Sequence, residues 1–216
     1  MPEKTQQCYG RLGHERLRLP RLHRPAAHAG GAARAASSRS VRRVWLSRAH
    51  RWSNAIHRAR LLGLRIDGVV SHERQWTWEE FHALPFETVP CDIHCVTKWS
   101  KLGTSFGGVS VDTLLEGVEP QGSFAIAYSY GGYTTNLALA DLTGGKAWVA
   151  TEHEGEPLAR EHGGPARLLV PHLYFWKSAK WVAGLRILDH DEPGFWEKNG
   201  YHNRGDPWQE ERYWSD

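Results

Sequence analysis

Cysteine is scarce in this sequence of 216 residues, which contains only Cys8, Cys91 and Cys95. So few cysteines exclude a small secreted domain held together by disulfides, and they favour a reducing compartment. We therefore expect a cytoplasmic protein. His94 lies between Cys91 and Cys95, but the paired Cys-x-x-Cys and His-x-x-x-His spacings of structural zinc sites are absent. The pattern does not favour zinc.

Long apolar runs are also absent. No stretch of 18 or more apolar residues occurs, so we expect no membrane-spanning helix. The first residues lack the apolar centre of a secretory signal, and Arg42 with Arg43 precede only a short mixed segment, which argues against a twin-arginine signal. The composition, 40% apolar and 11% aromatic, is sufficient for one large domain with its own core.

Acidic residues are nearly missing from the first part of the chain. Residues 1–60 hold 14 Lys and Arg against 2 Glu, whereas the remaining residues hold 13 basic and 22 acidic side chains. Because residues 10–60 also show no sustained apolar period, we interpret them as a disordered basic segment, with the folded domain over residues 61–216. A basic tail could bind nucleic acid, but the acidic body argues against nucleic acid as a partner.

Apolar periodicity from Leu64 onward predicts several short elements. Strands are expected at residues 64–70, 147–150, 167–170 and 180–188, and a hairpin over residues 124–139 turns at Gly131 and Gly132. Thr77 and Ser110 are expected to cap two short helices, and a last helix is expected between Asp191 and Gly200. Residues 90–108 look irregular. The predicted class is α+β with mixed and antiparallel sheets.

Three segments contain residues suited to chemistry. Cys95 is flanked by Lys98 and Lys101, whose charge favours a thiolate, although a small buried hydrophobic cysteine is the commoner case. His162 and Arg167 surround two glycines, as in a phosphate or pterin site or in an ordinary Gly-Gly-Pro turn. Residues 171–181 interleave aromatic rings with Lys177, Ser178 and Lys180, as in an anion-binding loop or in aromatic core with lysines reaching solvent.

Four motifs together resemble the molybdenum-cofactor domain of the sulfite oxidase family, in particular its small prokaryotic members related to the catalytic subunit of protein-methionine-sulfoxide reductase. They are residues 94–100 (HCVTKWS), 132–136 (GYTTN), 162–167 (HGGPAR) and 177–181 (KSAKW), in the family's order. The resemblance covers residues 64–213 and implies a sulfite oxidase-type molybdopterin-binding fold.

The resemblance implies that molybdenum-molybdopterin is the cofactor and that Cys95 is its protein ligand, soft sulfur being a suitable donor. Cys95, Tyr133 and Arg167 are the implied catalytic residues. The residues implied in cofactor binding are His94, Cys95, Thr97, Thr134, His162, Arg167, Lys177, Ser178 and Lys180.

The implied reaction is a two-electron oxygen-atom transfer on a small sulfur-containing substrate of the sulfite or sulfoxide type. Because the haem and dimerisation domains of sulfite oxidases from higher organisms are not seen, electrons are expected to pass through a separate partner protein. The alternative is a molybdopterin-binding protein without turnover, either a carrier or a damaged family member.

The resemblance begins abruptly at Leu64. Family members carry before this point an ordered segment that reaches the pterin, and the Arg-, Ala- and His-rich stretch does not match it. The composition resembles GC-rich DNA read in a wrong frame, which motivates the hypothesis that part of residues 10–60 is a frameshifted translation.

Overall fold

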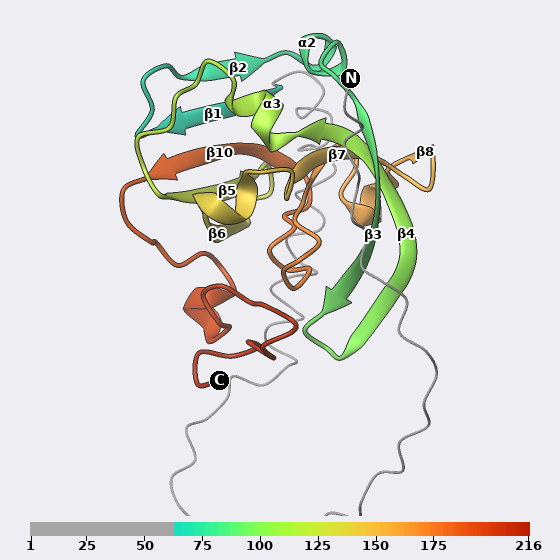
Figure 1. Cartoon of the computed structure of the whole chain (residues 1–216), viewed down its shortest axis with the longest axis vertical. Helices are drawn as coiled ribbons and strands as arrows, with labels where there is room; N and C mark the ends of the chain where they lie inside the picture. Colours follow the sequence, from blue (N-terminus) through green and yellow to red (C-terminus); the bar gives the residue numbers. More distant parts are fainter. Residues whose placement is uncertain (1–62) are drawn as a thin grey trace, which may run out of the picture. The chain divides into compact units, whose positions relative to one another are not determined.

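The computed structural model describes residues 63–216, so the predictions for residues 1–60 lie outside the described part. Its strands form two sheets (Figure 1). The first has the strand order β2 (Arg74–Trp76), β1 (Leu64–Gly68), β10 (Val182–Leu188), β5 (Phe124–Ser129) and β6 (Thr134–Ala138). β1 and β10 are parallel and the other neighbours are antiparallel. The expected α+β class with mixed sheets is confirmed.

The second sheet has the order β3 (Glu87–Cys95), β4 (Trp99–Ser110), β7 (Trp148–His153) and β8 (Glu156–Pro157), and β9 (Arg167–Leu169) pairs with β7. The expectation that residues 90–108 are irregular is wrong. β3 and β4 form a long hairpin that is paired from Glu87 and Gly108 down to Cys95 and Trp99 (Figure 1). Its turn is hard to recognise in the sequence because Lys98, rather than glycine or asparagine, adopts the left-handed conformation there, with φ of 68°.

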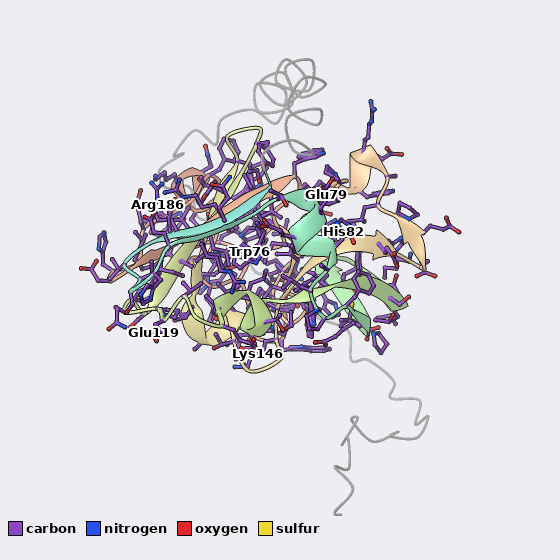
Figure 2. The ribbon with its side chains drawn as sticks, turned by 90° about the horizontal axis from the view of Figure 1, so that it is seen from above. Trp76, Glu79, His82, Glu119, Lys146 and Arg186 are labelled. Carbon is purple, nitrogen blue, oxygen red and sulfur yellow. The ribbon has the colours of Figure 1, made fainter. Side chains whose placement is uncertain are left out.

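The predicted helix caps are confirmed. Helix α2 (Trp78–His82) begins after Thr77, whose hydroxyl accepts the Glu80 N–H while the Glu80 carboxylate accepts the Thr77 N–H. Figure 2 looks onto this helix, with Glu79 and His82 along it and Trp76, which is buried, further inside. Helix α3 (Val111–Leu115) begins after Ser110, whose hydroxyl accepts the Thr113 N–H.

The expected helix between Asp191 and Gly200 is reduced to a short 3-10 turn, η2 (Glu197–Asn199), which Gly200 ends in the left-handed region. Gly194 explains this, because a Cβ at that position would lie 2.5 Å from the Thr135 Cα. The chain must pass close against β6 here before it can turn. Four further short elements were not predicted, namely β2, β8, α4 (Leu139–Leu142) and η1 (Arg160–His162).

Two clusters of buried side chains hold the described part together. The larger one joins the first sheet to the short helices and to β4 and β7, with Ile66, Phe81, Leu114, Leu168 and Leu185 fully buried. Each such side chain contributes about 1.5–3 kcal/mol on burial. The smaller cluster lies under β3, β4 and β7, and Phe175 packs on its border. Among residues 63–216, no helix is long and apolar enough to cross a membrane.

Candidate functional site

The thiol of Cys95 lies at the end of the β3–β4 hairpin. Cys95 is the last residue of β3, and its carbonyl accepts the Lys98 N–H at 3.0 Å to close the turn. Cys95 is partly exposed as a residue, and its Sγ atom lies 3.1 Å from the Thr97 hydroxyl oxygen. A free thiol at a rigid hairpin end has a defined direction and remains reachable by a ligand.

Cys91 occupies a different environment four residues earlier on β3. Burial, and then the neighbouring Asp92 carboxylate, raise the pKa of its thiol to about 11. Cys91 and Cys95 are both free, and over residues 63–216 no group of three or more His, Cys, Asp or Glu side chains is arranged to hold a metal. The described residues therefore give no support to a zinc site made of Cys91, His94 and Cys95.

His94 connects the Cys95 hairpin to the segment that contains the fourth motif. Its ring shares a hydrogen bond with the Ser100 hydroxyl at 2.8 Å, and its backbone carbonyl accepts the Phe175 N–H at 2.8 Å. This second bond joins residues that are far apart in the sequence. It brings the Cys95 motif next to the loop that precedes β10.

Arg167 is a buried cation at the centre of this region, with only 2% of the residue exposed. Its guanidinium donates to the carbonyls of His162 and Ser178, both at 2.9 Å, and lies over the Phe175 ring at 3.9 Å. Within the described part of the chain it forms no ion pair with a carboxylate. Burial lowers its pKa to about 9, so it is still charged at neutral pH. A buried unpaired cation favours an incoming anion.

Two cavities meet at Arg167 and Phe175. The first has a volume of about 110 Å³ and is otherwise lined by Tyr133, Trp176, Ser178, Lys180, Trp181 and Trp196. The second has a volume of about 180 Å³ and is otherwise lined by Ile93, Trp99, Lys101, Phe106, His153 and His162. Aromatic walls with several cationic side chains suit a planar, negatively charged group.

Lys180 adds a second cation to the first cavity. Its ammonium donates to the Glu161 carbonyl, and burial followed by the charge of Arg167 lowers its pKa. The Ser178 hydroxyl accepts the Val170 N–H at 2.9 Å and so fixes the loop before β10. Gly164 of the third motif serves packing, because a Cβ there would lie 2.0 Å from the Leu158 carbonyl oxygen, and Gly163 adopts a left-handed φ of 109°.

Tyr133 contributes its phenol to the wall of the same cavity. The hydroxyl donates to the Trp176 carbonyl at 2.6 Å. Burial, and then the nearby Glu197 carboxylate, raise the pKa of Tyr133 well above its usual value. The phenol is therefore neutral at physiological pH and acts as a hydrogen-bond donor.

Two of the expected cofactor residues point elsewhere. The Lys177 ammonium is fully buried and donates to the Glu197 carboxylate at 2.7 Å and to the Asn136 side chain at 2.8 Å. Thr134 lines a separate cavity with Arg186 and Pro193. Their predicted contacts to the cofactor find no support in this geometry.

The sequence indicated Lys101 only as a positive charge beside Cys95 and Trp176 only as a ring of the segment 171–181, and it did not indicate His153 or Trp196. Lys101 and His153, from β4 and β7, line the second cavity with their polar atoms 3.1 Å apart. Trp176 and Trp196 line the first cavity, and Tyr201 contacts both rings. The aromatic rings interleaved in residues 171–181 indicated part of these walls, and Trp196 lies outside that segment. No local pattern showed that β7 would bring His153 to Arg167.

The described residues fit a molybdenum-pterin group. Cys95, a partly exposed residue, offers one free thiol, and Arg167 and Lys180 offer two cations without carboxylate partners among residues 63–216, which suit a phosphate. The cavities on either side of Arg167 have aromatic walls for a flat ring system.

The chain is similar to several known proteins. The family described as oxidoreductase molybdopterin binding domain matches residues 53–196. The uncharacterized oxidoreductase YuiH of Bacillus subtilis (strain 168) is 45% identical over 152 residues, which are 69% of this chain and 77% of YuiH. The putative protein-methionine-sulfoxide reductase subunit YedZ1 of Azospira oryzae is 27% identical over 140 residues, which are 64% of this chain and 53% of that protein.

A solved structure shares the fold. The sulfane dehydrogenase SoxCD from Paracoccus pantotrophus superposes with a TM-score of 0.55 at 24% identity, over 62% of this chain and 39% of that chain. The chain thus spans about three quarters of YuiH but only about half of YedZ1.

Proposed function

This chain belongs to the oxidoreductase molybdopterin-binding domain family, and from that premise we propose that it transfers an oxygen atom to or from a small sulfur-containing substrate of the sulfite or sulfoxide type. Family membership makes it a molybdopterin-dependent oxidoreductase of the sulfite oxidase type. The observation that carries the proposal is the buried, unpaired Arg167 between two aromatic cavities, beside a hairpin that presents the free thiol of Cys95.

Molybdenum-molybdopterin, when bound, supplies two-electron oxygen-atom transfer at a sulfur lone pair. The protein residues bind and orient this group. Cys95 would give its sulfur to the metal, with the Thr97 hydroxyl fixing the direction of the Sγ atom at 3.1 Å. Arg167, Lys180 and His162 would hold the pterin and its phosphate.

Other side chains would act around the bound group. Ser178 keeps the loop before β10 in place through Val170, and the neutral Tyr133 phenol, anchored on the Trp176 carbonyl, forms part of the wall that excludes water. Lys101 at the second cavity would attract an anionic substrate, whereas burial and then the charge of Lys101 lower the pKa of His153 and favour its neutral ring.

We further propose that the catalytic domain begins near residue 61, that it works in the cytoplasm, and that a separate electron-transfer protein exchanges electrons with it. Sparse cysteine usage supports the compartment. The names of two similar proteins, a methionine-sulfoxide reductase subunit and a sulfane dehydrogenase, support a sulfur-containing substrate.

Metal analysis tests the proposal. Protein made in a host that synthesises the cofactor should contain close to one molybdenum per chain, and Cys95→Ser should lose most of it. Cys91→Ser is the matched control, because this second thiol lies on the same strand but is half-buried and has a raised pKa, and it should keep its metal. Full molybdenum occupancy in Cys95→Ser would remove Cys95 from the role.

Turnover distinguishes an enzyme from a binding protein. The loaded wild-type protein should oxidise sulfite with an artificial electron acceptor, or reduce a sulfoxide with an artificial donor. Stoichiometric molybdenum and pterin without either reaction would favour the alternative, a cofactor-binding protein without turnover.

A further inference from the structure

The C-terminal segment after η2 reaches back to the Cys95 hairpin through one side chain. Arg212 Nη1 donates to the Val96 carbonyl at 2.7 Å and lies 3.5 Å from the Cys95 carbonyl oxygen. The matched family region ends at residue 196, so this contact comes from outside it. In Figure 1 the C-terminal segment lies near the turn between β3 and β4.

The backbone of Arg212 is itself fixed. Its N–H donates to the Asp216 carboxylate at 2.9 Å, and its carbonyl accepts the His202 N–H at 3.2 Å. The facing pair of Tyr201 and Tyr213 closes the same turn. The guanidinium therefore extends from a defined support rather than from a free chain end.

The Arg212 guanidinium makes a shorter contact with the hairpin carbonyl of Val96 than with the carboxylate of Glu210. Its side chain is 13% exposed, whereas the carboxylate of its partner Glu210 is 75% exposed and 3.4 Å away. Exposed pairs at this distance contribute little. The guanidinium carbon also lies 4.8 Å from the centre of the Tyr174 ring, which is buried.

Three successive carbonyls around the thiol thus receive donors. The Phe175 N–H binds the His94 carbonyl, the Lys98 N–H binds the Cys95 carbonyl, and Arg212 binds the Val96 carbonyl. Two of these donors come from outside the hairpin. Because a metal ligand must keep its direction as the charge on the metal changes, partners that fix its backbone matter as much as the ligand itself.

We propose that Arg212 is a positioning residue that holds the Cys95–Val96 backbone and thereby sets the direction of the Cys95 sulfur toward the metal. The inference rests on the proposed function in one respect, namely that Cys95 is the metal ligand. If Arg212 has this role, the C-terminal segment is part of the structure that positions the metal ligand.

Hydrogen exchange of the full chain tests the contact directly, with and without cofactor. In Arg212→Met, peptides covering residues 92–100 should exchange about tenfold faster, because a hydrogen bond from a charged donor to this loop is lost. Peptides covering β5 and β6 should not change. Arg204→Met is the matched control, since this arginine lies in the same segment but pairs with Asp141 and Asp206, and its exchange over residues 92–100 should equal that of the wild type.

The metal provides the second measurement. In loaded Arg212→Met, the thiolate-to-molybdenum charge-transfer absorption should shift or weaken, and Arg212→Lys, which can still donate to the Val96 carbonyl, should restore most of it. Unchanged exchange over residues 92–100 overturns the proposal. Faster exchange with unchanged absorption also overturns it, because Arg212 would then support the loop without affecting the sulfur.

The outcomes separate this proposal from the proposed function. If Cys95→Ser keeps its molybdenum, Cys95 is not the ligand and the positioning role fails with it, although the exchange result still shows whether Arg212 holds the loop. If Cys95→Ser loses the metal while Arg212→Met behaves as wild type, only the positioning role fails. Should Arg212→Met not fold, Arg212→Lys takes its place, with a smaller change in the same direction expected.

Discussion

Arg167 illustrates how a single residue can carry most of the case for a binding site. Its charge is buried, its guanidinium donates to backbone carbonyls, and its pKa is lowered to about 9 by burial. Such a cation is costly for the empty protein and becomes favourable when an anion pairs with it. The stability of the protein should therefore depend on anions.

We expect inorganic phosphate to stabilise the metal-free protein through Arg167. At ten times its dissociation constant a ligand adds about 1.4 kcal/mol, which raises the midpoint of thermal unfolding by a few degrees. In Arg167→Met this rise should disappear, while in Arg186→Met, which removes an exposed arginine paired with Asp67, it should remain. Thermal scans at constant ionic strength measure the effect, and equal rises in all three proteins would argue against an anion site at Arg167.

Cysteine and lysine show what the sequence could and could not reveal at this scale. The motif around Cys95 predicts the metal ligand from the types and order of neighbouring residues alone. Lys177 belongs to an equally clear motif, yet its ammonium is fully buried against Glu197. A motif gives the residue type and its order in the chain, but the side-chain direction depends on contacts with distant segments.

At the scale of the secondary-structure elements, the Lys177–Glu197 pair links β6, the loop before β10 and η2. The Glu197 Oε1 atom accepts the Lys177 ammonium at 2.7 Å, the Trp176 indole N–H at 2.9 Å and the Thr135 hydroxyl at 3.0 Å. Both charged side chains are fully buried, and burial lowers the pKa of Lys177 despite its partner. Removing one partner leaves a buried charge alone.

Lys177→Met should therefore destabilise the protein by about 3–5 kcal/mol. The double variant Lys177→Met with Glu197→Gln removes both charges and keeps an acceptor for Trp176 and Thr135, so it should recover a large part of the loss. Urea unfolding of the wild type, both single variants and the double variant gives the coupling energy. If the losses in unfolding free energy of the two single variants add up to that of the double variant, Lys177 and Glu197 do not stabilise each other.

The hairpin of β3 and β4 shows why some elements could not be predicted. The helix caps at Thr77 and Ser110 depend on residues three positions apart, and both were found from the sequence. The hairpin depends on pairing along its whole length and on a left-handed Lys98, where a glycine would have been a recognisable signal. Cys95 is therefore positioned by a hairpin, β3–β4, that was not predicted from the sequence.

At the scale of the whole molecule, Asp141 joins three separate parts of the described chain. From α4, its carboxylate lies 3.1 Å from the His172 ring nitrogen and 3.6 Å from the Arg204 guanidinium. The hydrogen bond from His172, and after it the charge of Arg204, hold the pKa of Asp141 below its ordinary value of 3.8. Folding thus favours the ionised carboxylate.

The contribution of Asp141 to stability should be complete above its unfolded pKa and should be lost as the pH falls through its lowered folded pKa. At pH 6, Asp141→Asn should cost about 1 kcal/mol, and the difference from wild type should narrow toward pH 3. Urea unfolding of both proteins between pH 3 and pH 7 measures this. A difference that stays constant with pH would show that the carboxylate charge is not the cause.

The sequence by itself determined the family, the expected cofactor, the mixed α+β class and the helix caps. These depend on short motifs and on local hydrogen bonds, whose partners are neighbours in the chain. The family and the cofactor could be read from residues 94–100, 132–136, 162–167 and 177–181, and the helix caps from Thr77 and Ser110, without knowing how the chain folds.

The tertiary structure decided which of these residues share a site. It paired β1 with β10, which lie near opposite ends of the described sequence. It buried Arg167 without a carboxylate partner among residues 63–216. It also brought Arg212 to the Val96 carbonyl, 116 residues away in the sequence. Such contacts form because apolar surface is buried between distant segments. Local sequence patterns do not show which backbone carbonyl a distant side chain will bind. In this site, the contact of Arg212 with the Val96 carbonyl helps to determine the environment of the Cys95 sulfur.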